Sequence, residues 1–222
     1  MGRASVRAGT VPVSVRVLLS RLFLLALLAS RPAFAGEAFG IFSPCRGDCA
    51  IAVYGGRYVE DSMSELLLTS PKPPQSWEFP EDDRIVALAA SRRVARFWTR
   101  FTLEPEVGLA QRLGRQEATE VWGAFFVRYH GFPWDGVLVT TAAVSTGLNW
   151  ADKITDVERA RAKDGEGSNL MHFFAPEITF AAPSRPDVQL VLRFHHRSGV
   201  FGLVSDAWGG AQYATVGLRV FF

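Results

Sequence analysis

The run from Phe194 to Gly199 (FHHRSG) holds the residues with the clearest capacity for chemistry. His196 and Ser198 are two positions apart, so in a β-strand their side chains point to the same face. An imidazole beside a serine hydroxyl is the core of acyl transfer, because it removes the hydroxyl proton and then returns a proton to the leaving oxygen. The alternative interpretation is a polar collar at a membrane interface.

The other titratable residues that stand out are three carboxylates and two further histidines. Glu104, Glu106 and Glu177 are candidates for paired-carboxylate catalysis, but arginines of the same strand parity favour an enclosed ion network instead. Those arginines are Arg100, Arg112, Arg193 and Arg219. His172 belongs either to the histidine–serine site or to a membrane interface, and His130 is predicted to be structural.

Cys45 and Cys49 are the only two cysteines of the chain. In an exported protein such a closely spaced pair is expected to close a small loop as a disulfide. With no histidine nearby, the pair would make a poor metal site. The sequence implies neither a metal nor an organic cofactor.

The first residues have the pattern of an export signal. Several arginines precede a short apolar stretch from Leu22 to Ala29, and the small-x-small run at 33–35 (AFA) follows as a cleavage site. The stretch is shorter than the ~20 residues that a membrane-spanning helix needs, although an uncleaved helical anchor is the alternative. We therefore expect a signal peptide at residues 1–35 and one folded domain at residues 36–222.

The composition favours a single all-β domain. The 222 residues suffice for one domain plus a targeting segment, and a net charge of +2 does not point to nucleic acid as a partner. Twenty glycines and seventeen phenylalanines suit strands and turns better than helices. Eight segments are predicted as strands: Ala50–Val59, Arg84–Arg93, Phe97–Gly114, Thr119–Gly131, Trp134–Trp150, Leu170–Pro183, Val188–Gly199 and Gly210–Phe222.

Apolar and polar residues alternate along these segments, so each strand has an apolar face and a charged face. The clearest case is the third segment, whose apolar face comprises Phe97, Phe101, Leu103, Val107, Leu109 and Leu113. Two kinds of barrel fit this pattern. A soluble lipocalin-like barrel places the apolar face inside, whereas a membrane barrel turns it toward lipid and encloses the charges.

The lengths of the connections favour the membrane barrel. Three of the four connections on one side are long, at residues 60–83, 151–169 and 200–209, and the fourth, at 115–118, is short. The turns on the other side are short, at residues 94–96, 132–133 and 184–187. Short turns on one side and long loops on the other are typical of bacterial outer-membrane barrels. The charged segment 152–167 is predicted to contain a solvated helical turn, with a plain loop as the preferred interpretation.

The last predicted strand ends on Phe222, and an alternating final strand that stops on an aromatic residue resembles the C-terminal signature of outer-membrane barrels. The sequence therefore predicts an eight-stranded antiparallel up-and-down transmembrane β-barrel in a bacterial outer membrane. A barrel of this size is filled by its own side chains, so no porin-like channel is expected.

The histidine–serine run resembles one family in particular, the PagL-type lipid A 3-O-deacylases, through residues 190–222. The family's H-x-S motif matches His196-Arg197-Ser198, which implies that His196 is the base and Ser198 the nucleophile. The family has an asparagine that helps to hold the oxyanion where this chain has Gly199. Its orienting acid falls near the start of the last strand, where the nearest match is Gln212.

The resemblance implies an ester hydrolase whose partner is lipid A, or lipopolysaccharide, in the outer leaflet. An amide such as that of Gln212 holds an imidazole but does not stabilise imidazolium as a carboxylate does. Asp206 is a possible substitute, and the loop from Ser205 to Gly210 is a possible source of backbone N–H groups for an oxyanion. Two other hypotheses stay open: a non-catalytic membrane barrel of the same architecture, and a soluble lipocalin-like carrier.

Overall fold

The computed structural model describes residues 37–38, 43–63, 65–66, 71–80, 82–163, 165–200, 202–205, 207 and 209–222. The predicted signal peptide lies outside these residues, and so do Asp206 and Trp208. No helix in the described part of the chain is long and apolar enough to cross a membrane.

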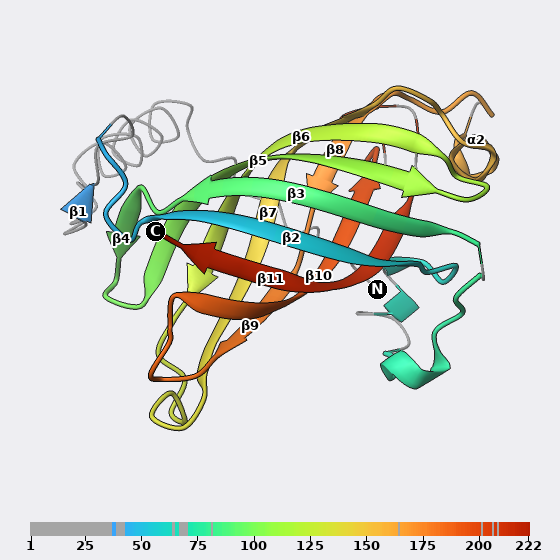
Figure 1. The fold of residues 1–222 in the computed structure, drawn as a ribbon. Coiled ribbons are helices and arrows are strands. Elements are labelled where there is room, and N and C mark those ends of the chain that lie inside the picture. The colour runs from blue at the N-terminus through green and yellow to red at the C-terminus, as the bar shows by residue number, and fades with distance from the viewer. Residues whose placement is uncertain are drawn as a thin grey trace, which may run out of the picture. The chain divides into compact units, whose positions relative to one another are not determined.

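The described residues form one closed antiparallel barrel with eight strand positions (Figure 1). Its strands are β2 (Cys49–Tyr58), β3 (Arg84–Arg92), β5 (Phe101–Leu113), β6 (Ala118–Tyr129), β7 (Val139–Ala151), β8 (Leu170–Phe174) with β9 (Glu177–Ala181), β10 (Val188–Ser198) and β11 (Gln212–Phe221). A short strand, β4 (Ala95–Phe97), continues the position of β3 along β5 and forms a hairpin with β5, and the two-residue strand β1 (Glu37–Ala38) pairs with β4. All eight predicted strands are confirmed.

The ring is closed by the first and last strands. β11 pairs with β2 over nine residue pairs, from Tyr213 opposite Tyr58 to Phe221 opposite Ala50. The remaining neighbours follow chain order, including β5 with β6 and β6 with β7. Figure 1 shows the helix α2 at one end of the barrel, and β4 with the C-terminus at the other. We call these the long-loop end and the short-turn end.

The predicted alternation is confirmed, with the apolar face outward. Val53, Leu109 and Leu218 are at least half exposed, whereas Arg112, Arg128 and Arg219 are fully buried within the ring. A wall of exposed aliphatic side chains around an enclosed charged interior is the inverse of a lipocalin-like barrel. The soluble-carrier alternative is therefore wrong, and the fold is that of a transmembrane barrel.

Aromatic side chains gather at the short-turn end. Phe97, Trp98, Phe101 and Tyr129 lie in ring contact, with centroids 5.3 to 5.9 Å apart. Trp134 extends the cluster across the next turn, through Phe132. Amphipathic aromatic rings are enriched at membrane–water interfaces, so this cluster fits the edge of the apolar wall.

Two predicted turns at this end are misplaced. The turn expected at 94–96 lies instead at Trp98–Arg100, so Phe97 pairs with Phe101 across a hairpin and does not continue its strand. Trp98 and Thr99 have φ values of 48° and 58°, a region that Gly or Asn usually fills, so the sequence carries no turn signal there. The turn expected at 132–133 spans 130–138, because β7 begins at Val139 and not at Trp134.

The sixth strand position is interrupted by Ala175 and Pro176 without a change of register. Phe174, just before the interruption, pairs with His196 of β10, and Glu177, just after it, pairs with Arg193. Both pairs have the same register relative to β10. Proline has no N–H to donate to a ladder, and the N–H of Ala175 donates to the Ser145 hydroxyl at 2.7 Å. The predicted strand 170–183 is thus confirmed as two pieces.

The charged segment 152–167 contains a short helix, α2 (Asp156–Arg161), so the predicted helical turn is confirmed and the preference for a plain loop is wrong. Thr155 accepts from the N–H of Glu158, and the Glu158 carboxylate accepts from the N–H of Thr155. This reciprocal pair is a capping box. It fixes the start of the helix and turns Glu158 into the barrel, where its side chain is fully buried.

The predicted disulfide is confirmed between Cys45 and Cys49. It lies at the short-turn end, where Cys45 precedes β2 and Cys49 is the first residue of that strand. The N–H of Gly47, inside the small loop, donates to the Phe222 carbonyl at 2.9 Å. The loop therefore adjoins both strands of the closing seam.

Candidate functional site

His196 and Ser198 lie on the outer wall of β10 near the long-loop end. Both side chains are partly buried, and they share the outward parity of Leu190 and Leu192. His195, which precedes the pair, and Arg197, which lies between its two members, point into the lumen. Both are fully buried there. The face predicted for the histidine–serine pair is therefore confirmed.

Cross-strand register brings two further polar residues to this pair. Gln212 in β11 lies directly opposite His196, and His172 in β8 lies directly opposite Ser198. The Nε2 atom of His172 lies 2.9 Å from the hydroxyl oxygen of Thr146. Four polar side chains from three strands thus gather around β10, which is the grouping that an outward-facing acyl-transfer site needs.

The internal geometry of this cluster is less suited to catalysis. No hydrogen bond joins His196 to Ser198 in the part of the chain that the structure describes, and the enclosed Nδ1 of His196 has no hydrogen-bond partner there. A general base must come within about 2.6–3.2 Å of the proton that it removes, although such contacts often tighten only when substrate binds. No described carboxylate orients the imidazole.

Gln212 lies beside His196 and also contacts a loop. Its side-chain amide donates to the backbone carbonyls of Val59, at 3.4 Å, and Asp61. These carbonyls belong to the start of the loop between β2 and β3, so Gln212 fastens this loop to the barrel wall. The side chain is 1% exposed. Its predicted role as the orienting group for His196 stays a prediction.

Gly199 occupies its position for a steric reason. An added Cβ would lie 1.6 Å from the backbone oxygen of Ala207 and 2.6 Å from that of Ser205. The loop between β10 and β11 therefore rests directly on this residue, and an asparagine there is excluded unless the loop moves. Carbonyl oxygens, which accept hydrogen bonds, face the place where the deacylase-like pattern requires an oxyanion donor.

The histidine with a carboxylate partner is His195, inside the lumen. Its Nε2 lies 2.9 Å from Glu120, and its Nδ1 lies 3.0 Å from the Tyr54 hydroxyl. The ring also packs edge-on against Trp122 and Phe173, with centroids 5.1 and 4.9 Å away. Because His195 is fully buried among these groups, this arrangement contributes packing and hydrogen bonds within the lumen.

Among the described residues, five arginines and five glutamates fill the lumen, each at most 5% exposed. The part of the network that lies away from the long-loop end is continuous. Glu177 contacts both Arg128 and Arg193 at 2.6 Å. Glu104 contacts Arg128 at 3.0 Å and Arg219 at 2.7 Å. The predicted ion network is confirmed for Glu104 and Glu177, and Glu106 joins it through Arg193 at 2.7 Å. Arg100, predicted for the same face, lies instead in the turn before β5 and is exposed.

The upper part of the network lies at the long-loop end. Arg112 contacts Glu120 at 2.8 Å and Glu158 at 3.2 Å, and Arg197 also contacts Glu158 at 3.2 Å. The helix α2 thereby places a carboxylate between two lumen arginines. Sequence reasoning missed this plug, although the spacing from Thr155 to Glu158 is the T-x-x-E signal of a capping box.

The structure is similar to two solved membrane barrels. One is Neisserial surface protein A, with 10% identity, a TM-score of 0.46 and coverage of 81% of this chain and 100% of that chain. The other is a de novo designed transmembrane β-barrel, with 10% identity, a TM-score of 0.41 and coverage of 82% and 100%. No family model matches the chain, and no curated protein matches it.

Proposed function

We propose that this chain is a non-catalytic barrel of a bacterial outer membrane, which blocks its own lumen and holds long loops at the membrane surface. The observation that carries the proposal is the balanced lumen network of five arginines and five glutamates. Side chains this large, paired across the ring, leave little room for water or solutes. The glutamate on α2 adds a charge-paired cover at the long-loop end.

Purified protein reconstituted in planar bilayers tests the blocked lumen. We expect no stepwise single-channel current from the wild type, because ion passage requires several buried pairs to separate together. A porin of known conductance serves as the positive control. Reproducible channels from the wild type would contradict the proposal. Separation of inner and outer membranes by density, followed by heat-modifiable gel mobility, tests the location and the folded barrel.

A lipid A deacylase-like esterase is the second candidate function. It is favoured by the grouping of His196, Ser198 and His172 on the outward wall, together with the H-x-S resemblance. In that reaction the Ser198 hydroxyl attacks the ester carbonyl while His196 takes its proton. The same proton then goes to the departing alkoxide, and water releases the acyl group from the serine.

One assay separates the two functions. Protein in detergent is incubated with lipopolysaccharide, and the mass of lipid A is followed over time for the wild type and Ser198→Ala. The non-catalytic proposal expects no acyl loss from either protein, and no labelling of Ser198 by a fluorophosphonate probe. Acyl loss that disappears in Ser198→Ala would establish the esterase instead.

A further inference from the structure

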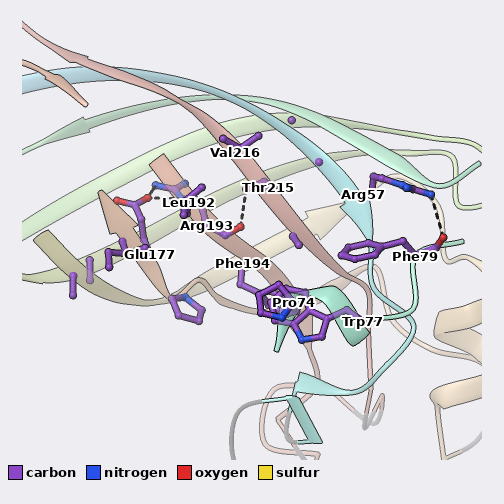
Figure 2. Close-up of a pocket in the computed structure, with 17 residues that line it drawn as sticks. Arg57, Pro74, Trp77, Phe79, Glu177, Leu192, Arg193, Phe194, Thr215 and Val216 are labelled. Atoms are coloured by element: carbon purple, nitrogen blue, oxygen red, sulfur yellow. Dashed lines mark hydrogen bonds and ion pairs between the residues drawn. The ribbon is translucent and has the colours of Figure 1, made fainter. Parts of the chain in front are cut away.

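A groove of about 770 Å³ crosses the outer wall beside the loop between β2 and β3 (Figure 2). Its floor is a single rung of five strands, in which each residue pairs with the next. In order they are Gly55, Val216, Leu192, Ile178 and Ala142. The residues at both ends of the rung, Gly55 and Ala142, are small, and they leave space on either side of the larger residues in its middle.

The loop forms the upper side of the groove. Trp77 packs edge-on against Phe194 of the wall, with ring centroids 5.8 Å apart. Phe79 lies under the guanidinium of Arg57 at 5.5 Å, and the Trp77 indole N–H donates to the Lys72 carbonyl at 2.9 Å. These contacts, together with the hydrogen bonds from Gln212 to the start of the loop, hold Trp77 and Phe79 over the rung. We call this aromatic pair the shelf.

The groove has the length and position for a lipid chain. Five neighbouring strands, about 4.8 Å apart, span roughly 19 Å. Because barrel strands tilt by about 35–45°, this rung runs obliquely across one leaflet, which is about 15 Å deep in a hydrocarbon core of ~30 Å. The floor belongs to the same apolar wall as the exposed Val53 and Leu218. Since this wall faces hydrocarbon, the medium that enters the groove is acyl chain.

A charged group marks one end of the groove. Arg57 is exposed near the long-loop end of β2, and its Nη2 donates to the Phe79 carbonyl at 3.1 Å, as Figure 2 shows. No described acidic side chain pairs with it. A guanidinium held in place by a backbone carbonyl, with donors left over, suits the recognition of a phosphate.

We propose that this groove binds one glycerophospholipid, with an acyl chain along the rung and the phosphate at Arg57. The site differs from the proposed esterase site, because it needs neither His196 nor Ser198. It also goes beyond the blocked-barrel function, which makes no use of the outer wall. The ligand is a resident or regulatory lipid, held because the groove buries more of its chain than the convex wall elsewhere does.

Native mass spectrometry of the full mature chain tests the proposal. Protein delipidated in detergent is titrated with phosphatidylglycerol. We expect one tightly retained lipid on the wild type, and its loss from Ala142→Trp, at the β7 end of the groove, and from Ala214→Trp, beneath Trp77 and Phe79. Val121→Trp, on the exposed wall of β6, is the matched control and should retain the lipid. Heat-modifiable mobility confirms that each variant is folded.

The head group is tested separately. Arg57→Gln should weaken phosphatidylglycerol binding about tenfold, the usual effect of losing a hydrogen bond to a charged group, and leave diacylglycerol binding unchanged. Quenching of Trp77 fluorescence by one equivalent of phosphatidylglycerol with brominated chains, absent in Trp77→Phe, places the chain under the shelf. Equal retention in the filled variants and the wild type would overturn the proposal, and so would a dimer in place of a lipid adduct.

Discussion

At the scale of single residues, the lumen is stabilised by buried ion pairs, and removing one partner leaves the other charge buried and unpaired. Arg193 donates to Glu106 and to Glu177, at 2.7 and 2.6 Å. Arg193→Met would leave two buried carboxylates with fewer cations, and breaking a buried pair in this way costs about 3–5 kcal/mol. We expect unfolding in detergent at a markedly lower denaturant concentration.

The matched control is Arg185→Met. Arg185 pairs with Asp187 in an exposed turn, where the guanidinium is two-thirds exposed. Exposed pairs of this kind contribute about 0–1 kcal/mol, so this variant should unfold close to the wild type. Similar midpoints for the two variants would show that the lumen pairs contribute no more than a surface pair.

Gly199 is a second residue whose replacement has a steric prediction. In Gly199→Ala the new methyl group would collide with the Ala207 carbonyl, so the loop must shift, and overpacking of this kind costs about 1–3 kcal/mol. Gly123→Ala is the control, because a Cβ there meets nothing within 4 Å. Hydrogen exchange should quicken across residues 200–211 only in Gly199→Ala. Unchanged exchange would contradict the close contact.

At the scale of elements, the helix α2 acts as a fastened plug. Glu158→Ala removes both the carboxylate between Arg112 and Arg197 and one half of the capping box. We expect hydrogen exchange of residues 152–169 to rise by more than tenfold, because a lost cap weakens a helix by about 1 kcal/mol and the loss of the two buried ion pairs adds to this. Asp156→Ala, on the exposed side of the same first turn, should change exchange little. Equal effects would contradict the plug.

The loop over the groove has a pH-dependent fastening outside the membrane. Lys72 donates to the Asp61 carboxylate at 2.5 Å, and this hydrogen bond lowers the pKa of Asp61 and raises that of Lys72. The contribution of Asp61 is therefore present above its ordinary pKa of about 3.9 and is lost as the pH falls through the lowered value. The contribution of Lys72 is complete below about 10.4 and is lost as the pH rises through the raised value.

The emission of Trp77, obtained by subtracting that of Trp77→Phe, measures this fastening. We expect it to be constant from about pH 5 to pH 9 and to shift in strong acid, as the bond to Asp61 is lost. Asp61→Asn should show the shifted emission at neutral pH and no acid transition. An acid transition that persists in this variant would assign the effect to another group.

Period-two alternation was sufficient to predict eight strands and the outward face of His196, Ser198 and Gln212. The remaining features depend on partners in other strands and loops. The turn at Trp98 has no glycine to signal it, and the contact of Gly199 with Ala207 follows from the path of a loop. The engagement of Gln212 with the carbonyls near Val59 depends on the register between the first and last strands, which alternation within one strand does not contain.

At the scale of the whole molecule, two kinds of surface are separated by one layer of backbone. Each strand places alternate side chains in the closed, charge-balanced lumen and in the apolar wall. The deacylase-like motif and the proposed lipid groove both lie on the wall, whereas stability and the proposed blocking of the barrel depend on the lumen. Substitutions at lumen positions are therefore expected to change unfolding, and those at wall positions to change lipid contact.

The seam between β2 and β11 has a consequence for biogenesis. Residues 50–58 of β2 pair with β3 on one side and with residues 213–221 of β11 on the other. The second pairing joins segments far apart along the chain, and such contacts form slowly. A polypeptide stalled anywhere before Tyr213 exposes two unpaired strand edges, which are templates for aggregation. Until residues 213–221 pair with β2, both strand edges stay open to pairing with other chains.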